Sequence, residues 1–423
     1  MNAVKTLPEW LAYIEQQHPQ DIAMGLERVR AVAERMRLTR PAKKVITVGG
    51  TNGKGSTVAF VEAIARAGGW AVGSYTSPHL LRYNERVRIG GEEAGDAQLV
   101  AGFEAVEAAR GDTPLTYFEY GTLAALWLFE QADLDLAVLE VGLGGRLDAV
   151  NLVDADVAVI TTVDIDHTDW LGADREAIGT EKAGIARPWK PLVLGEIDPP
   201  SSVLRRAYAI GANAIRAGSD FFHEPIDAEQ WRWRDVGTTL ELPSPQLRAP
   251  VQRANAATAI AALRALRKAL PRNAYAEGVA AAQLRGRLQP FVRDGVEVLV
   301  DVGHNPQAAR ELAAALQAQP RAGSTRAVFA ALADKDAAGA VQALAGQVAA
   351  WYLAGLPGAR GQSGAQLQAR LAGTDAAAAA TVADSVAQAL QQALAQAQPG
   401  DRVLVFGSFR TAADALHWLH SAG

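Results

Sequence analysis

The sequence predicts an α/β fold in which most strands of the sheet run parallel. Short apolar runs rich in β-branched residues alternate along the chain with stretches of helical periodicity, a pattern typical of parallel sheets with helical crossovers. A glycine-rich segment at Gly49–Gly55 separates one such run from one such stretch. A second series of strands begins near Val296 and predicts a second, smaller α/β domain of Rossmann-like type.

The strands expected in the first domain are short, apolar runs followed by turn residues or by the start of a helical pattern. They are Lys44–Val48, Ala71–Tyr75, Leu136–Val141, Val157–Val163 and Pro191–Leu194. Because helical patterns separate them, we expect one largely parallel sheet.

The stretch Phe221–Pro250 has a different character, since Trp231 and Trp233 stand in alternation before a turn-rich Pro-Ser-Pro sequence. This alternation favours a small β-hairpin elaboration at about 221–250. The helical periodicity that follows predicts a helix from Asn255 to about Leu270.

The second domain repeats the α/β pattern on a smaller scale. Its expected strands are Val296–Val300, Arg326–Ala330, Trp351–Ala354 and Val403–Phe406. The Ala- and Gln-rich tract Ala376–Gln398 keeps apolar residues at helical spacing, which predicts a helix. These patterns place the first domain at 1–288 and the second at 289–423.

The composition excludes several classes of function. A net charge of −5 leaves no basic excess to neutralise nucleic-acid phosphates. The chain has no cysteine, so disulfides, thiolate nucleophiles and cysteine zinc sites are impossible. The longest apolar runs, such as Leu123–Phe129, are far shorter than the roughly 20 residues of a membrane span, and the start of the chain lacks a signal-peptide pattern. We therefore expect a cytoplasmic protein without nucleic-acid or membrane partners.

The segment Val48–Thr57 (VGGTNGKGST) is the strongest functional signal in the chain. Glycines let several backbone N–H groups point inward, and a following helix N-terminus adds partial positive charge, so the segment can hold phosphate oxygens. Lys54 can reach the terminal phosphates, and the hydroxyl of Ser56 or Thr57 can hold Mg²⁺. The spacing departs from a standard Walker A motif, because Gly55 separates the lysine from the hydroxyl residue. We predict an N-terminal P-loop-type ATPase domain; the alternative is a glycine-rich turn with a solvated lysine.

Polar residues also follow other predicted strands, at the sheet edge where α/β proteins bind ligands. Glu140 ends an apolar run, and a carboxylate there needs a metal or a cation such as Arg146. His167 follows another strand and is either a metal ligand or an N-cap or core histidine. Taken alone, Ser77 indicates a turn residue and Lys182 a lysine on a helix surface.

Seven motifs in fixed order extend over nearly the whole chain. They are Gly25–Val29 (GLERV), the glycine-rich loop, Ser77–Val87 (SPHLLRYNERV), Thr116–Thr122 (TYFEYGT), Glu140–Ala149 (EVGLGGRLDA), Asp166–Ile185 with its DHTDWLG and EKAGI parts, and Asp301–Pro306 (DVGHNP). Together they resemble the folylpolyglutamate synthase family, which belongs with the Mur ligases, and in particular its bifunctional bacterial branch with dihydrofolate synthase activity.

The resemblance implies a role for each matching position. It assigns to ATP the residues Thr51, Asn52, Gly53, Lys54, Gly55, Ser56, Asn255, Arg287 and Asp301. It assigns to Mg²⁺ the residues Ser77, Glu140, His167 and a carbamylated Lys182, and the catalytic set is Lys54, Glu140, His167 and Lys182. It assigns to the pterin the residues Ile22, Ala23, Met24, Thr116, Tyr117, Phe118, Glu119, Leu147, Asp148 and Ala149. Tyr117 and Phe118 alternatively serve only as core aromatics.

Two positions depart from the family pattern. The family usually has alanine where Gly303 stands, and it often has an acid where Ala23 stands in the pterin segment. The first change preserves a close turn, whereas the second bears on the pterin contact.

The implied reaction is ATP-dependent addition of L-glutamate to dihydropteroate and to reduced folates through an acyl phosphate. The implied partners are these small molecules, and we expect a monomer. Two alternatives within the superfamily are a folylpolyglutamate synthase alone and a Mur-type peptidoglycan ligase. Two others are a P-loop ATPase or regulatory switch and a non-catalytic nucleotide-binding module.

Overall fold

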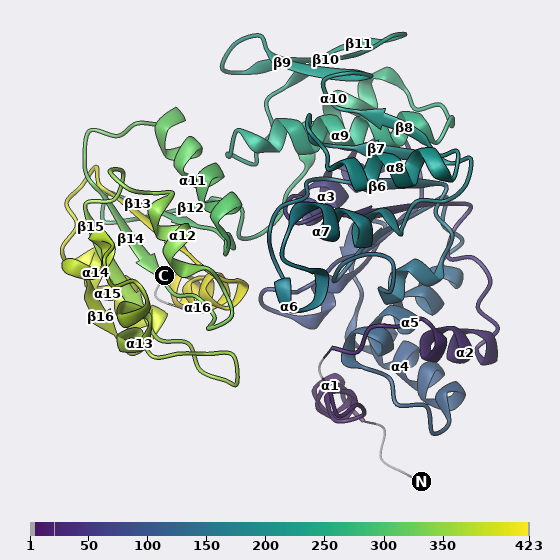
Figure 1. Cartoon of the computed structure of the whole chain (residues 1–423), viewed down its shortest axis with the longest axis horizontal. Coiled ribbons are helices and arrows are strands. Elements are labelled where there is room, and N and C mark those ends of the chain that lie inside the picture. The colour runs from purple at the N-terminus through teal and green to yellow at the C-terminus, as the bar shows by residue number, and fades with distance from the viewer. Residues whose placement is uncertain (1–4, 21, 422–423) are drawn as a thin grey trace. The chain divides into compact units, whose positions relative to one another are not determined.

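The structure, a computed structural model, describes residues 5–20 and 22–421 (Figure 1). The chain forms two compact units. The first contains the chain up to Gln246 together with Arg253–Ala282, and the second contains Leu247–Gln252 together with the chain from Gln283 onward. Among the described residues, no helix has the length and apolar character needed to cross a membrane. The functional limits 1–288 and 289–423 stay a prediction.

The first unit is built on an eight-stranded sheet. Its strands, in spatial order, are β4 (Glu92–Glu93), β3 (Val87–Ile89), β2 (Val72–Tyr75), β5 (Leu136–Glu140), β1 (Lys44–Gly49), β6 (Val157–Ile160), β7 (Pro191–Leu194) and β8 (Asn213–Arg216). The six strands from β2 to β8 are parallel, and β3 and β4 are antiparallel. Glu140 lies beside Val48, and Ile160 lies beside Gly49. The carboxyl ends of these central strands therefore meet at one edge of the sheet.

Helices cover both faces of this sheet (Figure 1). The helices of this part of the chain are α1 (Leu7–Glu15), α2 (Glu27–Arg35), α3 (Lys54–Ala67), α4 (Asp96–Arg110), α5 (Tyr117–Glu130), α6 (Thr168–Leu171), α7 (Arg175–Ala183), α8 (Ser201–Ala209), α9 (Val251–Ala265) and α10 (Arg272–Ala281), with 3₁₀ turns at Tyr83–Arg86 and Ala149–Leu152. Apolar residues of α4, α5, α7 and α8 join those of the strands in one core. Helix α3 packs on β1, β2 and β5 and against α10. Burial on both faces explains why these strands are continuous apolar runs.

A separate antiparallel sheet of three strands lies at 221–243, where the sequence predicted a hairpin. Its strands are β9 (Phe221–Pro225), β10 (Gln230–Asp235) and β11 (Thr239–Pro243). Trp231 and Trp233 are both buried, and the Trp233 Nε1–H donates to the Ala257 carbonyl of α9 at 3.1 Å. The hairpin prediction is thus corrected by one strand, because the β10 backbone pairs with β9 on one edge and with β11 on the other.

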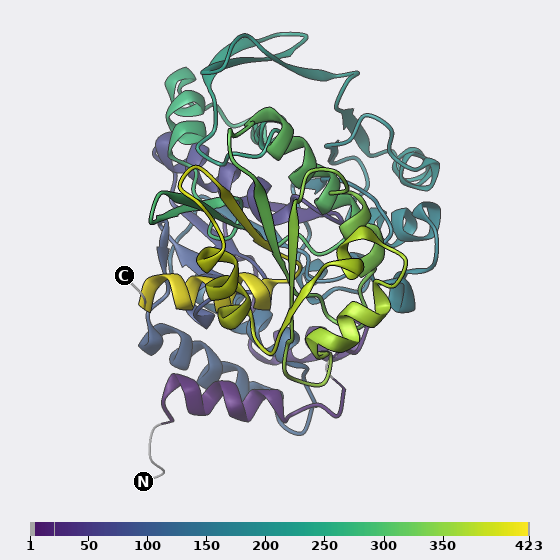
Figure 2. The same ribbon diagram turned by 90° about the vertical axis from the view of Figure 1, so that its left-hand side faces the viewer.

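The second unit contains a six-stranded sheet (Figure 2). Its strands, in spatial order, are β12 (Gln289–Arg293), β13 (Val296–Val300), β17 (Arg402–Phe406), β14 (Thr325–Phe329), β15 (Ala350–Ala354) and β16 (Thr381–Ala383). Its helices are α11 (Pro306–Ala318), α12 (Ala337–Gln342), α13 (Gly364–Arg370), α14 (Asp375–Ala378), α15 (Val386–Ala395) and α16 (Phe409–Ser421). Only β12 is antiparallel to its neighbour, so the α/β class predicted for both units is confirmed.

The helix predicted at Ala376–Gln398 is wrong in its first half. The tract contains the short helix α14, the edge strand β16 and only then the helix α15. Val382 pairs with Leu353 of β15. Pairing with a distant strand thus overrides the helical spacing of Val382 and Val386.

Candidate active site

The glycine-rich loop leads from β1 into α3 and has little space for side chains at two positions. Gly50 has a φ of +143°, and a Cβ there would lie 1.9 Å from the Thr161 hydroxyl. Gly53 has a φ of +84°, and a Cβ there would lie 2.6 Å from the Asn255 side-chain oxygen. Glycine is therefore required at both positions, by backbone conformation and by close neighbours.

The segment after β6 holds the loop in place. The Thr51 N–H donates to the Thr162 carbonyl at 2.7 Å, and the Thr161 hydroxyl donates to the Asn52 carbonyl at 2.6 Å. The Asn52 N–H donates to the Thr162 hydroxyl at 3.2 Å. These contacts end β6 at Ile160, three residues before the predicted end at Val163, because Thr161 and Thr162 bind the loop.

Lys54 is the first residue of α3 and lies across the loop. Its Nζ donates to the carbonyls of Gly50 and Thr51, at 3.1 Å each. Gly55, Ser56 and Thr57 are buried in the first turn of α3. The loop thus places one cation, a helix N-terminus and several backbone N–H groups together, the chemistry that binds a polyphosphate.

Glu140 is the last residue of β5 and is 5% exposed. Its Oε2 accepts the Ser77 N–H at 3.2 Å, which brings these two predicted metal ligands side by side. Arg146 pairs with Glu181 at 2.9 Å, so the alternative of a Glu140–Arg146 ion pair finds no support. The carboxylate stands next to the loop, since Glu140 and Val48 are partners in the sheet.

His167 stands at the start of α6 with a φ of +53°. Its backbone N–H donates to the Asp166 carboxylate at 2.8 Å. It occupies the N-cap position, but its side chain makes no capping hydrogen bond. The left-handed backbone turns the chain sharply between the end of β6 and α6.

Lys182 is 3% exposed in α7, so the interpretation of this residue as a surface lysine is wrong. Burial lowers the pKa of its amine to about 7, and the positive charge of Lys54 lowers that pKa further. Asp166 and Asp148 oppose this shift. A lowered pKa favours the neutral form of the Lys182 amine.

The side chains of this edge fit a hard divalent cation. In the described part of the chain, no three His, Asp or Glu side chains gather closely enough to hold a metal ion alone. Mg²⁺, however, is commonly held by one or two carboxylates together with substrate phosphates and water. The Glu140 carboxylate and the adjoining Ser77, beside a phosphate loop, match that donor set.

The predicted pterin segments converge around the start of α5. Thr116 caps this helix, accepting the Glu119 N–H at 3.2 Å, while the Glu119 carboxylate accepts the Thr116 N–H at 2.8 Å. Glu119 also pairs with Arg28 at 2.9 Å, and Arg28 donates to the Ala23 carbonyl at 2.8 Å. Glu119 is therefore already committed to a cap and an ion pair, through which α5 holds the segment that contains Ala23.

Other contacts close the same region. The centroids of the Phe118 and Tyr75 rings are 5.9 Å apart. A Cβ at Gly142 would lie 2.7 Å from the Phe118 ring. Phe118 and Tyr117 are partly buried and pack against the core of the first unit, so a role as core aromatics and a role at the pterin both stay predictions. The space at Gly144 is bounded by Met24 and Leu171.

The segment Leu147–Ala149 completes this region. The Leu147 carbonyl accepts the Gly25 N–H at 3.4 Å, and Ile22 is partly buried nearby in the chain. The Asp148 carboxylate accepts the N–H groups of Leu143 and Val150. Burial raises the pKa of Asp148 to about 7 against the effect of these hydrogen bonds.

The remaining ATP positions belong to different units. Asn255 lies against Gly53 in the first unit. In the second unit, buried Asp301 accepts the N–H groups of Leu288 and Gly303 at 2.8 and 2.7 Å. Burial raises the pKa of Asp301, and the charge of Arg287 opposes this. A Cβ at Gly303 would lie 3.0 Å from the Asp301 carboxylate, which leaves little room for a side chain there.

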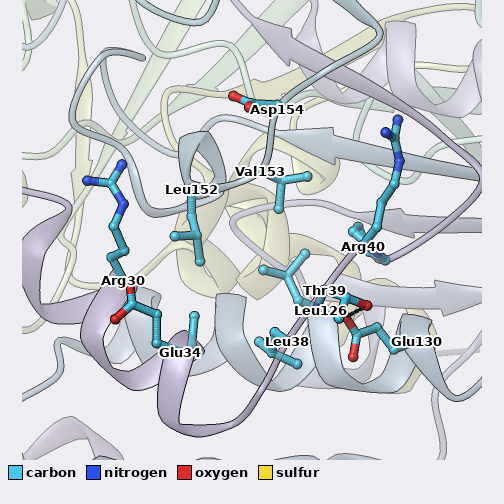
Figure 3. Close-up of a pocket in the computed structure, with 12 residues that line it drawn as sticks. Arg30, Glu34, Leu38, Thr39, Arg40, Leu126, Glu130, Leu152, Val153 and Asp154 are labelled. Atoms are coloured by element: carbon cyan, nitrogen blue, oxygen red, sulfur yellow. Dashed lines mark hydrogen bonds between the residues drawn. The ribbon is translucent and has the colours of Figure 1, made fainter.

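A pocket of about 300 Å³ lies near the amino ends of β1 and β6, away from the edge that carries the loop (Figure 3). It is lined by Arg30, Ala33, Glu34, Leu38, Thr39, Arg40, Pro41, Leu126, Glu130, Leu152, Val153 and Asp154. The Thr39 hydroxyl donates to Glu130 at 3.1 Å across it. None of the predicted site residues lines this pocket.

The sequence analysis did not identify Thr161 or Thr162. It also missed the ion pair of Arg175 and Glu196, in which a guanidinium nitrogen and a carboxylate oxygen are 3.1 Å apart. A usable signal existed for the threonines, since two hydroxyl residues directly follow an apolar strand beside the loop. No local signal existed for the ion pair, because its members are 21 residues apart in the chain.

Comparison with protein families identifies two matching models. The Mur ligase middle domain matches residues 48–248, and the Mur ligase glutamate ligase domain matches residues 286–409. These matches cover the phosphate loop in the first unit and Asp301 in the second.

Curated relatives match over nearly their whole length. The dihydrofolate synthase/folylpolyglutamate synthase of Escherichia coli strain K12 is 48% identical over 98% of this chain and 96% of its own length. The Haemophilus influenzae protein of the same name is 43% identical over 98% of both chains.

Solved structures agree with these relatives. E. coli FolC in complex with DHPP and ADP has a TM-score of 0.94 at 47% identity and covers 100% of this chain and 99% of its own. A bifunctional folylpolyglutamate synthase/dihydrofolate synthase with Mn, AMPPNP and L-glutamate bound has a TM-score of 0.91 at 47% identity over 99% of both chains. On this sequence identity, coverage and structural agreement, the chain belongs to the dihydrofolate synthase/folylpolyglutamate synthase family of the Mur ligases.

Proposed function

We propose that this chain is an ATP-dependent ligase that adds L-glutamate to 7,8-dihydropteroate, which forms dihydrofolate, and to reduced folates, which forms polyglutamates. The observation that carries the proposal is the grouping of a phosphate loop, the Glu140 carboxylate and a buried, low-pKa Lys182 at one sheet edge, in a chain 48% identical to a bifunctional relative.

The first step activates a carboxylate, which is a poor electrophile. The Lys54 ammonium and the loop N–H groups bind the ATP phosphates and offset charge while the γ-phosphoryl group passes to a carboxylate oxygen of the acceptor. ADP leaves, and the product is an acyl phosphate. The glutamate amine then attacks the acyl carbon, and inorganic phosphate departs as the amide forms.

Ser77, Glu140 and His167 would hold Mg²⁺, which supplies further neutralisation of phosphate charge when bound. We propose that Lys182 joins them as a carbamate. The Lys182 ammonium first loses a proton; the neutral amine then bonds to CO₂ and releases a second proton, so that a cation has become an anion. A pKa of about 7 supports this reaction, because only the neutral amine attacks CO₂.

Two further groups complete the assignment. Thr51 to Ser56, Asn255, Arg287 and Asp301 would contact ATP. The pterin would lie between the segments Ile22–Met24, Thr116–Glu119 and Leu147–Ala149. Glu119 would act indirectly, because it pairs with Arg28, which donates to the Ala23 carbonyl. We further propose that the enzyme works as a monomer in the cytoplasm, where ATP and glutamate are available.

The test is an assay of the purified protein with ATP, Mg²⁺, L-glutamate and either dihydropteroate or tetrahydrofolate. We expect ADP release that depends on both glutamate and acceptor, with a product heavier by one glutamyl residue. If only tetrahydrofolate is extended, the enzyme is a folylpolyglutamate synthase without dihydrofolate synthase activity. Turnover only with a UDP-linked acceptor would indicate a Mur-type ligase, and turnover without glutamate or acceptor would indicate a simple ATPase.

A further inference from the structure

The backbone of Val163 is held from two sides by charged side chains of other elements. The Val163 N–H donates to the Glu196 carboxylate at 3.1 Å, and the Arg175 Nε–H donates to the Val163 carbonyl at 2.8 Å. Arg175 and Glu196 also pair with each other at 3.1 Å. Because Val163 is buried, these side chains take the place of water for both backbone groups.

The next residue is held by the phosphate loop. The Thr51 hydroxyl accepts the Asp164 N–H and donates to the Asp164 carbonyl, at 3.0 Å each. Two neighbouring residues are therefore fixed by different elements, Asp164 by Thr51 and Val163 by the Arg175–Glu196 pair. His167 follows three residues after Asp164.

The pair also joins the elements that surround the site. Arg175 is the first residue of α7, the helix that contains Lys182, and Glu196 follows the end of β7. Arg175 additionally donates to the Asp198 carbonyl at 3.0 Å. One ion pair thus connects the segment before His167 with α7 and with the chain after β7.

Stability alone is a poor explanation for this pair. Glu196 is largely buried, and burial raises its pKa to about 7 even with the Arg175 charge opposing the shift. The Arg175 side chain is 40% exposed and that of Glu196 16%, and an ion pair that is only partly removed from water typically adds little net stability. What an apolar pair could not supply is the two directed hydrogen bonds to the Val163 backbone.

We propose that Arg175 and Glu196 are positioning residues that fix the segment Val163–Asp164 against the phosphate loop and so set the place of His167 for the metal–nucleotide complex. The inference rests on the proposed function, because it takes His167 as a ligand. Partners of this kind orient metal ligands, and their loss typically weakens metal binding by about 10- to 100-fold.

The experiment compares the full-length wild type with Arg175→Met, Glu196→Ala and Glu196→Gln. The affinity for AMPPNP is measured by calorimetry with Mn²⁺ and again with EDTA, and the Mg²⁺ concentration for half-maximal ligase activity is recorded. We expect Arg175→Met and Glu196→Ala to weaken Mn²⁺-dependent binding by about 10-fold or more, with little change in EDTA. Glu196→Gln keeps an oxygen for the Val163 N–H and should lie between Glu196→Ala and the wild type.

Arg205→Met is the matched control. Arg205 of α8 pairs with Glu176 of α7, the helix that also contains Arg175, at 3.5 Å on an exposed surface. The Arg205→Met substitution should leave the affinity for AMPPNP unchanged, both with Mn²⁺ and with EDTA. Equal loss of binding with Mn²⁺ and with EDTA, or an equal effect of Arg205→Met, would overturn the proposal in favour of a general structural role.

Two outcomes are kept separate by this design. If Glu196→Ala does not fold, Arg175→Met decides, and wild-type metal dependence in a folded Arg175→Met variant contradicts the inference. If the wild type binds Mn²⁺ and AMPPNP but forms no glutamyl product, the proposed function fails, while the metal-dependent affinities still test the positioning role.

Discussion

At the scale of single residues, the site contains charged side chains whose burial in the protein is energetically unfavourable. The charge of Lys54 helps to lower the pKa of Lys182, and Lys182 and Glu140 are both buried. Isolated buried charges are expensive and persist where a partner or ligand compensates them. Phosphates and a divalent cation would provide that compensation, which is why these residues are expected to matter for catalysis more than for folding.

Replacing Lys54 by alanine, or Glu140 by glutamine, should lower kcat by about 100- to 1,000-fold, as the loss of one preorganised charge contact does. Steady-state kinetics measures the effect, and circular dichroism checks the fold. Lys190→Ala, at an exposed lysine of the same unit, is the control. Unchanged kcat in a folded variant would remove that residue from the mechanism.

Carbamylation of Lys182 should depend on dissolved CO₂. We expect a carbamate signal in ¹³C NMR after addition of ¹³C-bicarbonate, absent from Lys182→Met but present in Lys190→Met. Activity should fall in CO₂-depleted buffer and return with bicarbonate, because the carbamate forms reversibly at a neutral amine. Full activity without CO₂ and without the signal would contradict this assignment.

At the scale of elements, helix α5 connects the core to the predicted pterin segments. Its capping box uses Thr116 and Glu119, and the same Glu119 carboxylate holds Arg28, which binds the Ala23 carbonyl. One side chain thus ends a helix and fixes a neighbouring segment. Changes at Glu119 should therefore separate into an effect on stability and an effect on the acceptor.

Glu119→Gln should keep the capping geometry but weaken the hold on Arg28, so the KM for dihydropteroate should rise while stability changes little. Glu119→Ala should additionally lose the cap, which costs about 1 kcal/mol of unfolding free energy. Kinetics and urea unfolding measure the two effects. Glu9→Ala, in the exposed capping box of α1, should affect stability alone.

At the scale of the whole molecule, two buried carboxyl groups of the first unit should shape stability as a function of pH. The pKa of Asp148 is raised to about 7 from an ordinary 3.8, and that of Glu196 to about 7 from 4.5, each mainly by burial. At a pH between the ordinary and the raised pKa of each group, the folded protein binds more protons than the unfolded chain does. The contribution of both groups to stability therefore falls as the pH rises from about 4 to 7.

Urea unfolding of the ligand-free protein at several pH values should show this decline. Asp148→Asn and Glu196→Gln should each flatten the slope between about pH 4.5 and 7, whatever they do to stability at one pH. Glu224→Gln, at a half-exposed carboxylate in the three-stranded sheet, should leave the slope unchanged. A slope identical in all variants would mean that neither group titrates in this window.

The two proposed activities also belong to the whole molecule, because dihydropteroate and reduced folates would share one site and differ in which carboxylate they present. We expect measurable kcat/KM for both acceptors, since this ratio reports relative transition-state binding. If Ala23 weakens the pterin contact, Ala23→Asp should raise the value for dihydropteroate more than that for tetrahydrofolate. An equal change for both acceptors would separate Ala23 from acceptor choice.

The α/β class, most of the parallel strands and the phosphate loop were predictable from the amino-acid sequence. These features depend on local properties: apolar runs that must be buried, and glycines that permit a φ of +143° at Gly50 and +84° at Gly53. The motif order was equally visible in the chain, and it led to the family that the comparisons confirm.

The burial of individual side chains and their contacts could not be predicted in this way, because they depend on how distant segments pack. Helical spacing at Lys182 indicated a surface residue, whereas packing buries it beside Lys54 and lowers its pKa. Thr51 and Asp164 meet across 113 residues of sequence, and β16 forms because β15 offers an edge. The physical reason is common to these cases: burial and pairing are set by distant segments, and local periodicity carries no information about them.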